Sequence, residues 1–135
     1  MKTHLEFTST AFPAYPEEDN EINPGIFGKR LAEFLAENLP QHGFKVLCIG
    51  HEDWGWMVEI ENKEFPLWIG CANYDGTEKE FQCFIEPSKP FLRKWFSKIE
   101  TGHIVDKLAA ALEAVLSQSG KVSNFRWLSD GEARR

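Results

Sequence analysis

One short segment of this sequence gathers the side-chain types that acid–base chemistry and metal binding require. Residues 50–56 read GHEDWGW, so an imidazole stands beside two carboxylates. Histidine titrates near neutral pH, which makes His51 with Asp53 a candidate acid–base pair. Adjacent side chains cannot all point at one ion, and the other histidines show no ligand spacing to this segment. Because composition without geometry is weak support for an active site, we favour a hairpin connection here.

A second segment, residues 89–98 (KPFLRKWFSK), interleaves four cations with three aromatic residues. Such interleaving suits phosphate contact combined with base stacking. It equally suits a surface segment whose aromatic side chains are anchored in the core, or a segment that docks on acidic groups such as those of residues 17–21. The net charge of −6 opposes binding to nucleic acid, so we favour the anchored segment.

The cysteines give no sign of a metal or redox centre. Cys48, Cys71 and Cys83 are widely spaced, and no C-x-x-C pair occurs. All three lie in apolar runs, where cysteine commonly acts as a small buried hydrophobic residue; a reactive thiol is the alternative. The sequence also lacks a G-x-S-x-G segment and a glycine-rich phosphate loop. We therefore assign no catalytic residue and expect neither a metal nor a cofactor.

Length and composition predict one globular domain over residues 1–135. The chain is 42% hydrophobic and 27% charged, which is ordinary for a folded protein of this size. The first residues lack the apolar stretch of a signal peptide, and no apolar run of about 18 residues occurs. We expect a cytoplasmic protein that binds neither membranes nor nucleic acid.

The hydrophobic pattern predicts an α+β fold with the order β-α-β-β-β-β-α-β. Apolar residues recur at helical spacing from Phe27 to Leu39 and from Ile104 to Leu116. Asn23-Pro24 and Thr101 are the expected helix starts. Strands are expected near residues 3–9, 44–49, 55–61, 65–71, 81–86 and 122–128. Short links imply an antiparallel meander, with both helices packed on one face as a two-layer sandwich.

Three other segments have a less regular character. Residues 10–24 form an expected exposed loop that is rich in proline and acidic residues, and residues 129–135 form a loose tail. The run at 44–49 (FKVLCI) is apolar enough for a strand covered on both faces. The pattern does not place residues 87–100.

Alternation along the predicted strands separates two faces of the sheet. Trp54 and Trp56 fall on the core face, with Val58 and Ile60. Met57, Trp68 and Phe84 fall together on the opposite face, among acidic neighbours. An uncovered patch of this kind usually marks an interface, although the N-terminal loop could equally fold over it.

Several motifs resemble those of a known family. EDWGW (52–56), FPLWIGC (65–71) and IEPSKP (85–90), together with NPG (23–25) and the helix behind it, resemble a family of small, uncharacterised bacterial proteins. The resemblance spans about residues 1–130. It implies a bacterial cytosolic origin and supplies no activity.

Two hypotheses of function follow. The first is a non-enzymatic interaction domain, immunity-like or chaperone-like, that binds a protein partner or a second copy through Met57, Trp68 and Phe84. The alternative is a small-molecule-binding or catalytic domain. Its pocket would lie at the His51-Glu52-Asp53-Trp54 turn and include Cys71.

Overall fold

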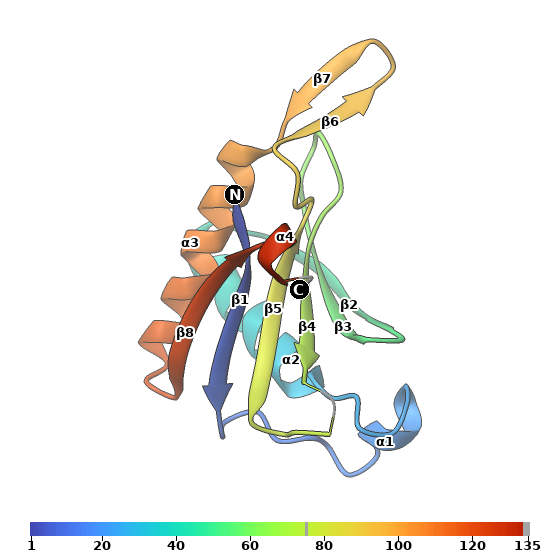
Figure 1. Ribbon diagram of the computed structural model, residues 1–135, viewed down its shortest axis with the longest axis vertical. Helices are drawn as coiled ribbons and strands as arrows, with labels where there is room; N and C mark the ends of the chain where they lie inside the picture. The colour runs from blue at the N-terminus through green and yellow to red at the C-terminus, as the bar shows by residue number, and fades with distance from the viewer. Residues whose placement is uncertain (75, 134–135) are drawn as a thin grey trace.

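The computed structural model describes residues 1–74 and 76–133, which form an antiparallel sheet and two long helices (Figure 1). The sheet strands are β1 (Lys2–Ser9), β2 (Val46–Glu52), β3 (Gly55–Ile60), β4 (Leu67–Asn73), β5 (Glu80–Glu86) and β8 (Val122–Ser129). A separate hairpin consists of β6 (Phe91–Lys94) and β7 (Ser97–Glu100). The long helices are α2 (Lys29–Asn38) and α3 (Gly102–Gln118); the short ones are α1 (Glu18–Glu21), η1 (Leu39–His42) and α4 (Asp130–Ala133). The predicted α+β class is confirmed.

The strand order of the sheet is β2-β3-β4-β5-β1-β8, with every neighbouring pair antiparallel. Strands β2 to β5 form the expected meander, because their short connections keep successive strands adjacent. The first strand pairs with β5 on one side and with the last strand on the other. Strands from both ends of the chain therefore complete the sheet.

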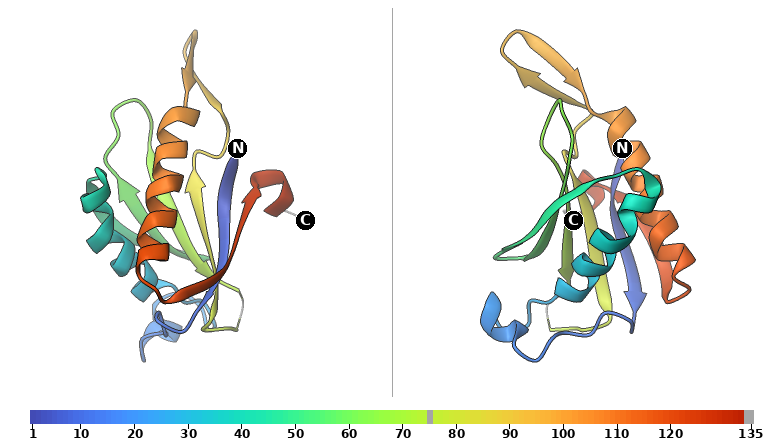
Figure 2. Two further views of the ribbon diagram at one scale, coloured as in Figure 1. Left: turned by 90° about the vertical axis from the view of Figure 1, so that its left-hand side faces the viewer. Right: turned by 180° about the vertical axis from the view of Figure 1, so that it is seen from behind.

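Helices α2 and α3 both cover one face of the sheet, as predicted (Figure 2). Their buried residues recur at helical spacing, including Leu31 and Leu35 in α2 and Leu108 and Leu112 in α3. Alternate residues of the strands complete this core from the other side, among them Val58 of β3. We call the side of the sheet opposite these helices the open face.

The loop before α2 differs from the expectation of a uniformly exposed segment. Phe12 is buried, and so is the carboxylate of Glu18. Glu18 accepts hydrogen bonds from the backbone N–H groups of Tyr15 (2.9 Å) and Lys29 (3.2 Å). Helix α2 begins at Lys29 and not at Asn23-Pro24. The Glu18 carboxylate accepts the backbone N–H of Lys29 at the N-terminus of the helix, where N–H groups lack partners within the helix.

Strand β2 is an edge strand, so the expectation of a strand covered on both faces is wrong. Among the described strands it pairs only with β3, and Leu47 is 56% exposed. The apolar composition of residues 44–49 suggested burial on both faces, but the burial of a strand also depends on which other strands flank it.

The end of the described chain is not a loose tail. Strand β8 continues to Ser129, and Asp130–Ala133 form α4, which lies on the open face beside β1 and β8 (Figure 2). Lys2 forms an ion pair with Glu132. Residues 134–135 lie outside the described part of the chain. No helix in the described ranges combines the length and apolar character needed to cross a membrane.

Candidate functional site

The open face brings together the three residues that the sequence selected for partner binding. In the strand register, Gly70 of β4 stands between Met57 of β3 and Phe84 of β5. Trp68 lies two residues before Gly70 in β4 and therefore on the same face of the sheet. All three side chains are partly buried.

Gly70 is the residue that allows Phe84 to lie down on the sheet. A Cβ atom at Gly70 would come within 2.3 Å of Phe84 Cζ, which is far closer than van der Waals contact. The ring therefore occupies the space that a side chain would fill. A glycine in the middle of a strand usually marks such a close approach.

Trp54 belongs to this face and not to the core, contrary to the sequence prediction. Its ring centroid lies 5.9 Å from that of Trp68, in a stacked arrangement, and 4.9 Å from that of Phe84. Trp68 and Phe84 are 5.7 Å apart and meet edge to face. We call Trp54, Trp68 and Phe84 the aromatic cluster; such ring pairs contribute about 0.5–1.5 kcal/mol each beyond burial.

Two carboxylates flank the aromatic cluster. Trp68 is paired in register with Glu59 of β3 on one side and with Glu86 of β5 on the other. Glu59 also accepts a hydrogen bond from the thiol of Cys48 on the edge strand, at 3.1 Å. This contact with Glu59 raises the pKa of the Cys48 thiol. Trp68 thus lies between two carboxylates.

The other border of the aromatic cluster is formed by the first strand. The His4 imidazole stacks on Phe84 with 5.6 Å between ring centroids. His4 is buried, its Nδ1 lies 3.0 Å from Thr3 Oγ1, and its Nε2 lies 3.8 Å from Asp130 of α4. Beyond His4 the face becomes polar, with Glu6 and Arg126 3.9 Å apart.

The residues of the alternative pocket do not converge. His51 is exposed near the end of β2 and Asp53 is exposed in the β2–β3 turn; the His51 and Trp56 rings meet edge to face with centroids 5.6 Å apart. Cys71 is fully buried on the helix side of the sheet, whereas Trp54 lies on the open face. Within the described ranges, no group of three or more His, Cys, Asp or Glu residues is placed to hold a metal ion.

The cysteines divide into two kinds. Cys71 and Cys83 are buried and opposite each other in the register of β4 and β5, and burial raises the pKa of Cys83 well above the usual range of a thiol. Cys48 is exposed, so the expectation of three buried cysteines is wrong for this one.

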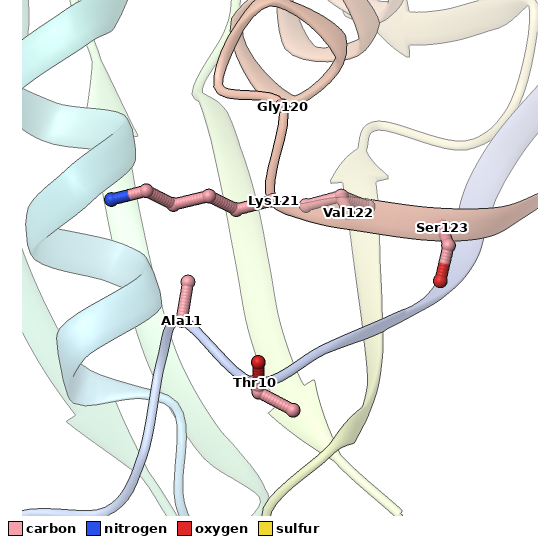
Figure 3. Close-up of a pocket in the computed structure, with 6 residues that line it drawn as sticks. All are labelled: Thr10, Ala11, Gly120, Lys121, Val122 and Ser123. Carbon is pink, nitrogen blue, oxygen red and sulfur yellow. The ribbon is translucent and has the colours of Figure 1, made fainter.

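A depression of about 630 Å³ lies between the loop after β1 and the turn from α3 to β8 (Figure 3). Thr10, Ser123 and Lys121 supply its polar groups, with Ala11, Gly120 and Val122. The Lys121 side chain, the one ionisable group among these lining residues, extends toward α2 (Figure 3). We assign no chemistry to it.

The segment at residues 89–98 carries the most exposed aromatic side chains of the described chain, which the sequence did not predict. Trp95 is 88% exposed and Phe96 is fully exposed, so the expectation that these aromatic residues are anchored in the core is wrong. They form the turn of the β6–β7 hairpin, with Trp95 at φ 57°. A positive φ is unfavourable for a bulky residue such as tryptophan. Leu92 and Ile99 supply the anchor instead, since they pack against the core.

Comparison with models of protein families, with curated proteins and with solved structures found no match for this chain. The motif resemblance to a bacterial family therefore stays a prediction. Any inference of function depends on the surfaces described above.

Proposed function

We propose that this protein is a non-enzymatic interaction domain that binds another protein through its open face. The observation that carries the proposal is the aromatic cluster, which is partly exposed and whose Trp68 lies between Glu59 and Glu86. Aromatic residues are enriched at protein interfaces, because their large surfaces bind with little loss of conformational entropy. The long helices α2 and α3 lie on the other side of the sheet, and α4 contacts β8 and β1.

The flanking carboxylates specify the chemistry of the partner. A cation placed over Trp68 would gain an interaction with the ring and with both Glu59 and Glu86. The partner surface is accordingly basic and apolar. The negative charge of Glu59 and Glu86 would also increase the rate of association with a basic partner at low ionic strength.

Photocross-linking in living cells tests this proposal. A photoreactive amino acid replaces Met57, at the border of the cluster, and in a matched control replaces Ser117, which is exposed on α3. We expect a discrete protein adduct from position 57 that Trp68→Asp abolishes, and none from position 117. An equal pattern from both positions, or no adduct from either, would contradict the proposal.

A further inference from the structure

The β6–β7 hairpin presents the most exposed large apolar side chains in the described part of the chain. Trp95 and Phe96 form its turn, and Phe91 near its base is 41% exposed. The hairpin projects from one end of the molecule (Figure 1). Contiguous apolar groups at this level of exposure usually mark a contact surface.

The same hairpin is strongly basic in an acidic protein. Arg93 and Lys98 stand opposite each other in the register, and Lys94 is adjacent to the turn. Among the described residues, none of these three cations forms an ion pair. Like charges at directly opposed positions destabilise a strand pair, so a negative partner surface would relieve this repulsion.

The base of the hairpin holds it in a defined position. The Thr101 backbone N–H donates to the carbonyl oxygen of Pro90 at 3.0 Å, and its hydroxyl donates to the carbonyl oxygen of Lys89. Leu92 and Ile99 pack against the core. Because the base is fixed, little conformational entropy would be lost when the turn binds a partner.

We propose that the partner of the open face is the β6–β7 hairpin of a second copy of this chain, and that the exchange is reciprocal. This inference rests on the proposed function. The hairpin offers what the face requires: Trp95 and Phe96 for the aromatic cluster, and Arg93, Lys94 and Lys98 for Glu59 and Glu86.

The position of the hairpin suits a two-fold dimer. Strand β5 ends at Glu86 and β6 begins at Phe91, so the hairpin rises from the end of the sheet where Glu86 flanks Trp68. It extends beyond the sheet of its own copy (Figures 1 and 2). A two-fold axis at this end would place each hairpin on the open face of the other copy. The dimer would then contain two identical contacts between a hairpin and an open face.

Two charge-reversed chains test the pairing. The first chain carries Arg93→Glu and Lys98→Glu and therefore has an acidic hairpin and an acidic face. The second carries Glu59→Lys and Glu86→Lys and has a basic hairpin and a basic face. Each alone should be monomeric in native mass spectrometry and sedimentation, because like charges would meet at both contacts. Mixed together they should form a heterodimer, because both contacts become complementary.

Three further samples complete the experiment. The wild-type chain should dimerise, Trp95→Ala with Phe96→Ala should weaken the dimer by at least about tenfold in Kd, and Lys107→Glu on α3 should leave it unchanged. Circular dichroism establishes that each variant is folded.

Contrary outcomes separate this inference from the proposed function. A monomeric wild-type chain at high concentration, or a mixture that stays monomeric, would overturn the dimer. If position 57 still cross-links to a different protein, the interaction role stands without self-association. A monomer that binds vesicles of anionic lipid through Trp95 and Phe96 would assign the hairpin to a lipid surface and would likewise overturn the proposal.

Discussion

At the scale of single residues, Cys48 links the exposed edge strand to the acidic border of the aromatic cluster. Its thiol donates to Glu59, and this contact raises the thiol pKa. Since the thiolate is the reactive form, Cys48 should react slowly with iodoacetamide at pH 8 despite its exposure. Glu59→Gln should accelerate labelling and move the pH–rate profile to lower pH. Labelling is measured by intact-mass spectrometry on the native protein.

Cys71 and Cys83 are internal controls for this experiment. Both are buried, so they should remain unlabelled until the protein is denatured. An unchanged rate in Glu59→Gln would show that the carboxylate does not hold the Cys48 proton.

Glu132 provides a test of pH dependence. The Lys2 ammonium, followed by hydrogen bonds from Ser129, lowers the pKa of Glu132 to about 2. The pKa of a glutamate in an unfolded chain is about 4.3, so folding favours the ionised form. The resulting stabilisation is present above the unfolded pKa and is lost as pH falls toward the folded pKa.

The variant Glu132→Gln should therefore have a lower urea midpoint than wild type at pH 5 to 8. The difference should shrink between about pH 4 and pH 2, and it should be smaller in high salt, because the pair is exposed. Glu78→Gln, in an exposed loop, is the matched control. A difference that does not change with pH would contradict this assignment.

At the scale of secondary-structure elements, the aromatic cluster depends on a glycine in the middle of a strand. Gly70→Ala would place a Cβ atom against the Phe84 ring and displace it. We expect a loss of about 1–3 kcal/mol in the free energy of unfolding, together with altered near-UV circular dichroism from Trp54 and Trp68. Gly50→Ala is the matched control, because its Cβ would meet only Met57 Cε at 4.0 Å. Equal effects of both substitutions would contradict this account of Gly70.

The start of α2 depends on a carboxylate that is distant in sequence. Glu18→Ala would leave the N–H groups of Tyr15 and Lys29 without their acceptor. Removal of such a partner costs about 1–3 kcal/mol. Glu18→Gln, which keeps one acceptor oxygen, should lose less, and the exposed neighbour Glu17→Ala should lose little. Chemical denaturation measures all three variants, and equal midpoints for Glu17→Ala and Glu18→Ala would refute the capping role.

The elements with clear periodicity could be predicted from the sequence, and so could the face to which Met57, Trp68 and Phe84 belong. Alternation failed for Trp54, because it applies within a strand and β3 begins only at Gly55. The β6–β7 turn could not be found, since Trp95-Phe96 contains none of the residues that usually signal a hairpin turn. The edge position of β2 depends on strand pairing over long sequence distances, which a single run of apolar residues does not encode.

At the scale of the whole molecule, the two sides of the sheet differ in the side chains that they carry. One side, beneath α2 and α3, holds the apolar core that stabilises the fold. The open face carries aromatic side chains that are only partly buried and are bordered by acids. The basic hairpin extends the molecule at the same end as these acids. This distribution supports the proposed interaction role, because the partly exposed aromatic groups are separated from the groups that maintain stability.

The most direct measurement of the central claim is hydroxyl-radical footprinting of the open face inside cells, compared with the purified protein at high dilution. If another protein covers this face, Met57 and Trp68 should be oxidised several-fold more slowly in cells than in dilute solution. Tyr15, which lies beside Arg30 of α2, should be oxidised at the same rate in both. Equal oxidation of Met57 and Trp68 in the two conditions would mean that the face is free in the cell and would contradict the interaction role.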